Sequence, residues 1–300
     1  MSATVTTQPQ KMDCPDEDMP VLSAKAGMKA PPGSRRIALG VEYCGTEFNG
    51  WQIQPEGLTI QRTVEEALRQ FANEPIDVIC AGRTDAGVHA TQQVISFTTS
   101  ACRTEDGWVR GVNRFLPKSV AIRWMRPVSD DFHARFCARS RTYEYWIWND
   151  RVRAPMLEDR TGWMFRPLDV ERMREGAKAL LGEHDFTSFR ASECQAKTPI
   201  RTMTELSIIR QGSLVGLRLT ANAFLQHMVR NIVGALIYVG TGRRDPKWIG
   251  ELLEARCREI AAPTFSPSGL YFVGVSYPDH PMIPQQGRSP FFGDFSRTTH

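Results

Sequence analysis

The segment AGRTDAGVHA, residues 81–90, places an acid, Asp85, in a short loop between glycines. Glycines allow the backbone to turn tightly and a ligand to approach it closely. A carboxylate displayed in this way can act on a substrate as a nucleophile or as a general base, and Arg83 places a positive charge beside it. The alternative is that Asp85-Ala86-Gly87 is only a turn, closed by a bond from the aspartate side chain to the backbone.

A second segment, FLQHMVRNIVG at 224–234, predicts a nearly all-apolar helix that carries His227 and Arg230 in its first turns. An unpaired buried charge is costly, so a buried Arg230 needs a carboxylate partner, and Asp85 is a candidate. The alternatives are that Arg230 reaches solvent along its apolar stem, and that His227 is a satisfied core histidine.

A third segment, RSRTYEYW at 139–146, combines arginines with alternating aromatic residues. Arginine next to aromatic rings is typical of single-stranded RNA recognition, where bases stack on both. The alternative is an amphipathic strand whose aromatic side chains, Tyr143 among them, fill the core.

Other kinds of site are poorly supported by the residue spacing. The six histidines show no HxH or HExxH pattern, and no GxGxxG, P-loop or nucleophile elbow is present, although a Ser-His-Asp triad stays open. None of the seven cysteines forms a CxxC pair, which argues against a disulfide framework and a thiolate zinc site. We therefore expect no metal and no cofactor, and a reducing, cytoplasmic setting.

Composition and charge favour a globular protein with a basic region. The chain has 300 residues, 41% of them hydrophobic, and a net charge of +4. Residues 103–174 alone carry a net charge of +5, and the chain has 30 Arg against 7 Lys. Arginine binds phosphate in a bidentate way, so nucleic-acid binding is one reading, and codon bias toward arginine is the other. No stretch reaches the roughly 20 apolar residues of a membrane span, and the first thirty residues show no secretory signal.

These segments must be positioned by regular elements, and the apolar periodicity predicts the same order twice. In the first half it predicts strands at 37–43, 76–80, 94–98 and 120–124, with helices at 60–71 and 108–116. In the second half it predicts strands at 143–148, 200–209, 214–220 and 269–277, with helices at 170–181, 224–239 and 246–255. Each half reads β-α-β-β-α-β, although this order is common and two occurrences do not require a duplication.

The predicted fold class is therefore α+β, with two ferredoxin-like half-domains that form a shared antiparallel sheet and a central active-site cleft. We expect a disordered leader at 1–34, half-domains at 35–137 and 138–278, and a loose C-terminal tail at 279–300, in which Phe291, Phe292 and Phe295 can dock.

Taken together, the motifs closely resemble the bacterial tRNA pseudouridine synthase A family from about Arg35 to Tyr277. The resemblance rests on GTEFNGWQ (45–52), TIQRTVEEAL (59–68), AGRTDAGVHA (81–90), SRTYEY (140–145), GEHDFTSFR (182–190), AFLQHMVRNIVG (223–234) and SGLYF (268–272). One departure is Cys44, where the family usually has Asp, and this puts any local role of that position in doubt.

The resemblance implies a cofactor-free isomerase that converts uridine to pseudouridine at positions 38, 39 and 40 of the tRNA anticodon stem-loop, and that works as a homodimer. It places the catalytic aspartate on Asp85 and its paired arginine on Arg230. It places the active-site tyrosine on Tyr143, contact with the flipped nucleotide on Arg83, and the apolar lining of the base pocket on Leu270.

Two other functions remain open from the sequence. One is a non-catalytic RNA-binding or tRNA-chaperone protein on the same scaffold, against which the Asp85, Tyr143 and Arg230 set argues. The other is a metal-free hydrolase that uses Asp85 for glycoside-type cleavage, although such enzymes usually need a second carboxylate and none stands out.

Overall fold

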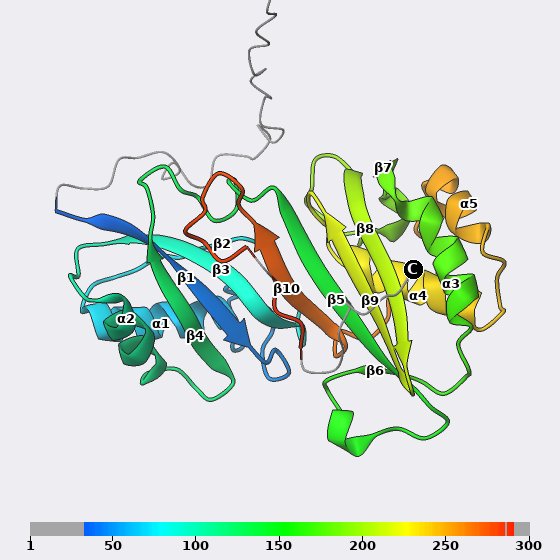
Figure 1. Ribbon diagram of the computed structural model, residues 1–300, viewed down its shortest axis with the longest axis horizontal. Coiled ribbons are helices and arrows are strands. Elements are labelled where there is room, and N and C mark those ends of the chain that lie inside the picture. Colours follow the sequence, from blue (N-terminus) through cyan, green and yellow to red (C-terminus); the bar gives the residue numbers. More distant parts are fainter. Residues whose placement is uncertain (1–32, 286, 291–300) are drawn as a thin grey trace, which may run out of the picture.

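The computed structural model describes residues 33–285 and 287–290 (Figure 1). Nearly all of the predicted leader therefore lies outside the described residues, as do Phe291, Phe292 and Phe295. In the described part of the chain, no helix has the length and apolar character needed to cross a bilayer.

The first half contains four strands and two helices. They are β1 (Arg35–Tyr43), α1 (Ile60–Ala72), β2 (Ile79–Cys80), β3 (His89–Thr99), α2 (Glu105–Asn113) and β4 (Val120–Pro127). Helix α1 forms because Ile60, Val64 and Leu68 recur on one face, and all three are fully buried. Helix α2 begins at a threonine cap, where the Thr104 side chain accepts a hydrogen bond from the Gly107 N–H.

The second half has the larger insertions. Its strands and α-helices are β5 (Ser140–Asn149), β6 (Gly162–Met164), α3 (Val170–Ala177), β7 (Gly182–Asp185), β8 (Ile200–Gln211), β9 (Leu214–Ala221), α4 (Met228–Gly240), α5 (Trp248–Ala255) and β10 (Leu270–Ser276). In Figure 1, α1 and α2 accompany β1, β3 and β4, whereas α3, α4 and α5 accompany β7, β8 and β9. Buried side chains of all five helices join one core with the strands.

The ten strands form a single sheet in the order β4-β1-β3-β10-β5-β9-β8-β7, with β2 beside β3 and β6 beside β5. Most neighbours are antiparallel, as predicted, and two pairs are parallel: β10 beside β3 and β6 beside β5. The parallel join between the halves is possible because β2 is so short. Strand β2 pairs only with Ile95 and Ser96 of β3, so His89 and Ala90 of β3 are left to pair with β10.

Three predicted elements are shorter than expected by three residues or more. The strand expected at 76–80 is reduced to the two residues of β2. The helix expected at 170–181 ends at Ala177 and continues as a 3-10 turn, because Gly182 takes a left-handed conformation (φ 95°) and starts β7. The helix expected at 224–239 begins only at Met228, because the preceding residues form a loop that packs on the sheet.

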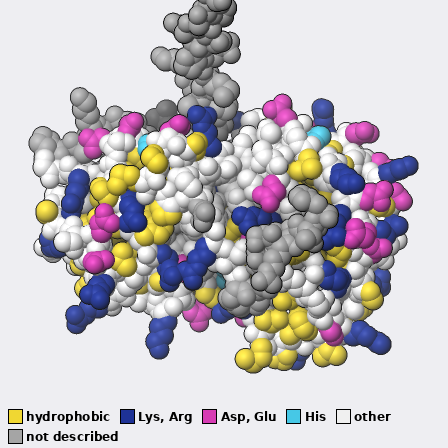
Figure 2. Space-filling model, in the orientation of Figure 1, with side chains coloured by type: hydrophobic (Ala, Val, Ile, Leu, Met, Phe, Trp, Pro, Cys, Tyr) yellow, Lys and Arg dark blue, Asp and Glu magenta, His cyan; other side chains and the backbone are white. Residues whose placement is uncertain are grey.

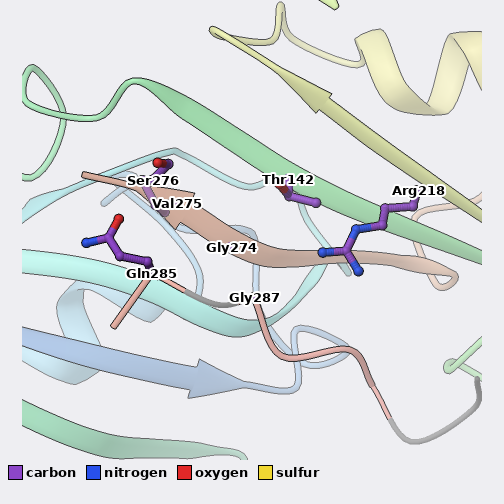
Figure 3. A pocket seen from close by; sticks show the side chains of 7 residues that line it. All are labelled: Thr142, Arg218, Gly274, Val275, Ser276, Gln285 and Gly287. Atoms are coloured by element: carbon purple, nitrogen blue, oxygen red, sulfur yellow. The ribbon is translucent and has the colours of Figure 1, made fainter. Parts of the chain in front are cut away.

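The face of the sheet that carries Thr142, Glu144 and Trp146 is partly covered by the segment after β10. The Arg288 N–H donates to the Val273 carbonyl at 3.0 Å, and Ser289 Oγ lies 2.5 Å from Glu144 Oε1. A cavity of about 320 Å³ remains there, lined by Thr142, Arg218, Gly274, Val275, Ser276, Gln285 and Gly287 (Figure 3). The described part of the predicted loose tail is therefore held against the sheet.

Candidate active site

The loop that carries Asp85 rests on the loop that follows β1. The Trp51 N–H donates to the Thr84 carbonyl at 2.9 Å, and the Gly87 N–H donates to the Phe48 carbonyl at 3.3 Å. Gly50 (φ 88°) makes this approach possible, since a Cβ atom there would lie 2.7 Å from the Thr84 oxygen. The GTEFNGWQ motif thus holds the aspartate loop in place through backbone hydrogen bonds.

Two buried polar side chains hold the same loop from the sheet. The Tyr43 hydroxyl shares a 2.8 Å hydrogen bond with the Thr84 hydroxyl, directly before Asp85. The Gln93 amide donates to the Gly82 carbonyl at 2.5 Å and accepts from the Gly82 N–H at 3.4 Å. These bonds fix Gly82 and Thr84, the residues on either side of Arg83. The loop therefore presents Asp85 in one position.

Helix α4 and the residue directly before it bring Arg230 and His227 to Asp85. Arg230 Nη1 lies 3.2 Å from Asp85 Oδ2, and its Nε donates to the Phe265 carbonyl at 2.9 Å. His227 Nε2 lies 3.5 Å from the same oxygen. Within residues 33–285 and 287–290, no donor bonds to the other carboxylate oxygen, Oδ1. The structure therefore joins Asp85 to Arg230 and leaves one oxygen available.

His227 adopts a left-handed backbone conformation, with φ 63° and ψ 0°. This conformation costs a non-glycine residue about 1–2 kcal/mol, although histidine is found there more often than most. The imidazole is about one-third exposed (32%), so the expectation of a core histidine is wrong. The helix begins after this residue, and the loop before it turns the side chain toward the aspartate.

Tyr143 lies on β5 in an aromatic cluster on the helix side of the sheet. Its ring meets Phe224 edge-on at 5.0 Å and Phe272 at 4.8 Å. Only 7% of the residue is exposed, and its hydroxyl has no hydrogen-bond partner among the described residues. Leu270 shares this face, since it pairs with Tyr145 two residues along from the Phe272 pair.

Burial controls the ionisation of this tyrosine. Loss of water around the ring raises the pKa of Tyr143 well above its ordinary value, and Tyr43 and the charge of Asp85 add to the effect. The phenol is therefore protonated at neutral pH. It offers an apolar face for stacking and an O–H group, but not a phenolate base.

Arg141, two residues before Tyr143, connects the segments that carry Asp85 and Arg230. Its guanidinium donates to the Ala81 carbonyl at 3.2 and 3.4 Å, at the start of the aspartate loop. It also donates to the Asn222 carbonyl at 2.8 Å, at the start of the loop leading to α4. Bonds to Arg135 and Ala138, at 2.6 and 3.1 Å, attach it to the connection between the halves. One side chain thus fixes three chain segments relative to one another.

Comparison with known proteins identifies the family. The family model described as tRNA pseudouridine synthase matches residues 40–137 and 177–278. The chain belongs to the tRNA pseudouridine synthase family. It is 53% identical to tRNA pseudouridine synthase A of Janthinobacterium sp. (strain Marseille), a match that covers 84% of this chain and 95% of that protein. It is 55% identical to the protein of the same name from Bordetella avium (81% and 92% covered) and 50% identical to that from Paraburkholderia xenovorans (86% and 96% covered).

Two further residues of this family member were singled out in the sequence, Arg83 and Cys44. Arg83 is exposed and makes no ion pair with the described residues, so its guanidinium is available. Cys44 bonds to Ser119 through its N–H and lies 3.4 Å from the Thr46 hydroxyl, so the departure from the family pattern does not touch the aspartate. Burial acts to raise the pKa of this thiol, but hydrogen bonds from His89 and Thr46 outweigh it and lower the pKa to about 6.

The described residues contain no cluster of three or more His, Cys, Asp or Glu side chains placed to hold a metal ion. Sequence reasoning missed His227 as a neighbour of Asp85, and it missed the roles of Tyr43 and Arg141. The signal for Arg141 was its place beside an expected site residue in the SRTYEY motif. No local pattern distinguishes Tyr43 from any other strand aromatic.

Proposed function

We propose that this chain isomerises uridine to pseudouridine at positions 38, 39 and 40 of the tRNA anticodon stem-loop, with Asp85 as the catalytic group. The observation that carries the proposal is the carboxylate geometry. Arg230 and His227 both approach Oδ2, so Oδ1 is free to act on a sugar. The names of the curated relatives supply the substrate class, tRNA.

The reaction breaks the N1–C1′ bond of uridine, turns the base over, and joins C5 to C1′, while C5 loses a proton and N1 gains one. Asp85 Oδ1 can form a bond to C1′ as nucleophile, which breaks again when C5 bonds to C1′, or it can remove a proton from the sugar as base and later return it. Arg230 stabilises the carboxylate before and after either step. No electrons are gained or lost overall, so the residues needed are those that hold the detached base and move one proton.

Tyr143 and Leu270 provide the surface for the detached base. The Tyr143 ring stacks on uracil, and Leu270 on the same face of the sheet adds apolar surface that helps to exclude water. Because burial keeps Tyr143 protonated, its O–H assists transfer of the C5 proton as a donor and relay, not as a phenolate.

A base in a stem must leave its stack to reach Asp85, at a cost of a few kcal/mol. Arg83 is exposed two residues from Asp85 and contacts the backbone of the flipped nucleotide. Phosphate contacts from the arginines of residues 103–174 offset the remaining cost. Figure 2, which shows the sheet face opposite Tyr143, has Lys and Arg side chains spread among Asp and Glu side chains rather than gathered in one patch.

The architecture that supports this function is two ferredoxin-like half-domains, at 35–137 and 138–278. The strand orders favour this division, since β4-β1-β3-β2 in the first half corresponds to β10-β5-β9-β8 in the second. The two matched segments of the family model fall one in each half. We further propose a homodimer that works in the cytoplasm.

The test is incubation of the wild-type protein with tRNA transcripts, followed by mapping of pseudouridine. We expect product in the anticodon arm, its loss in Asp85→Asn with tRNA binding retained, and normal product in the control Asp130→Asn, an exposed acid between the halves. Binding without product in the wild type would favour the RNA-binding rival, and free uracil would favour the hydrolase. Full activity of Asp85→Asn would refute the role of Asp85.

A further inference from the structure

His227 is held in its left-handed conformation from both sides. The Met228 N–H donates to the Leu225 carbonyl at 3.0 Å, and the His227 carbonyl accepts from the Asn231 N–H at 2.9 Å. Asn231 is buried and bonded to the Phe189 carbonyl at 2.8 Å. The surrounding structure therefore imposes a backbone conformation that a glycine would adopt without cost.

The strain is not explained by helix capping. His227 directly precedes α4, yet its side chain makes no hydrogen bond to the free N–H groups of that helix. Four described non-glycine residues have positive φ: Asn73, Asp159, His227 and Arg256. Of these, His227 is the one that lies against Asp85. Strained backbone at a functional site points to a role for the side chain that it orients.

The strained backbone brings the imidazole to the carboxylate. Nε2 lies 3.5 Å from Asp85 Oδ2, and Arg230 approaches the same oxygen at 3.2 Å from one helical turn further along. The distance from Nε2 is slightly longer than a hydrogen bond. Contacts of this kind shorten when substrate closes the site.

We propose that His227 is a positioning residue that acts with Arg230 to fix the rotation of the Asp85 carboxylate, an inference that rests on the proposed function of Asp85. A single donor on Oδ2 leaves the carboxylate free to turn about its Cβ–Cγ bond. A second donor on the same oxygen, from another direction, keeps Oδ2 in place and Oδ1 directed at the sugar. The imidazole supplies this donor through its Nε2–H.

Substitution by glycine separates this role from a structural one. His227→Gly removes the imidazole and relieves the backbone strain, so we expect an equal or higher melting temperature together with a fall in kcat. The fall is roughly ten- to hundredfold, the effect of a misplaced catalytic group, with KM for tRNA unchanged. His227→Asn, which also tolerates this conformation but is too short to reach Asp85, is expected to lose kcat in the same way.

Asn73→Gly is the matched control, because Asn73 has φ 58° at the exposed end of α1. It should leave kcat unchanged. Wild-type kcat in His227→Gly or His227→Asn would overturn the proposal, and so would a fall in kcat that follows a fall in melting temperature. Failure of the proposed function is distinguished by the wild type, which would then form no pseudouridine.

Discussion

Replacing Arg141 tests whether the three chain segments that it joins depend on this one side chain for their relative positions. Its guanidinium donates to the carbonyl oxygens of Ala81, Ala138, Asn222 and Arg135. Lysine keeps the positive charge but has a single nitrogen, which cannot reach oxygens on both sides of a planar fork. Arg141→Lys therefore removes the geometry and retains the charge.

The expected loss of stability follows from which carbonyls lose a donor. The bonds to Ala81 and Ala138 are partly buried, whereas those to Asn222 and Arg135 are exposed, so water replaces the second pair. A buried group left unpaired costs roughly 1–3 kcal/mol. We expect Arg141→Ala to lower the free energy of unfolding by about 2–4 kcal/mol, and Arg141→Lys by about half as much.

The effect on catalysis should exceed the effect on folding. Without the bonds to Ala81, the start of the aspartate loop loses its direct link to the strand that carries Tyr143. A displacement of about 1 Å between the two can cost roughly 100-fold in rate. We expect kcat of Arg141→Lys to fall by that order while KM for tRNA stays near the wild-type value. Single-turnover pseudouridine formation gives the rate, and urea denaturation gives the stability.

The control is Arg210→Lys. Arg210 also bonds to several oxygens, those of Leu168, Asn149 and Gly212, but none of these residues belongs to the candidate active site. It should lose stability and keep its kcat. If Arg141→Lys loses stability yet turns over at the wild-type rate, Arg141 only stabilises the fold and the reasoning is refuted.

Three further predictions concern the support of the site and the fold. Tyr43→Phe removes the bond to Thr84. We expect kcat to fall about tenfold and the free energy of unfolding to fall by about 1 kcal/mol. An unchanged kcat in single-turnover assays would contradict this. Gly50→Ala forces a Cβ to within 2.7 Å of the Thr84 oxygen, so thermal melts should show a loss of roughly 1–3 kcal/mol. The control Gly242→Ala, with φ 75° and open space, should lose less. Burial lowers the pKa of His133 to about 4, so its contribution to stability is present above pH 6.5 and is lost as pH falls toward 4, by up to roughly 3 kcal/mol. His133→Asn should flatten that profile in urea titrations, and an unchanged profile would show that another group causes it.

The sequence predicts those elements whose apolar residues face the core in a regular rhythm. Helix α1 follows from the spacing of Ile60, Val64 and Leu68, and strand β1 from the alternation that ends at Tyr43. Short edge strands such as β7, with the sequence GEHD, carry no such rhythm, because hydrogen bonding to β8 alone defines them. The parallel join of β3 to β10 depends on two residue pairs whose members lie far apart in the chain, and no local pattern encodes it.

The site was predictable to the extent that it lies in motifs. Asp85 and Arg230 belong to different halves, and the need of a buried arginine for a carboxylate linked them before the fold was known. The conformation of His227 was not predictable, because its neighbours Leu225 and Met228 continue a helical apolar pattern across a loop. There tertiary packing overrides local preference.

The position of β10 has a consequence for how the enzyme is made. This strand follows all the other described strands in the chain, yet it lies in the middle of the sheet and joins β3 to β5. Before it emerges, the strand that follows Asp85 has no partner in the second half of the chain. Contacts between segments separated by about 180 positions also form slowly, because closing a long loop costs entropy. A growing chain that has not yet reached β10 therefore lacks the strand that joins the β3 side of the sheet, which follows Asp85, to β5, which carries Tyr143.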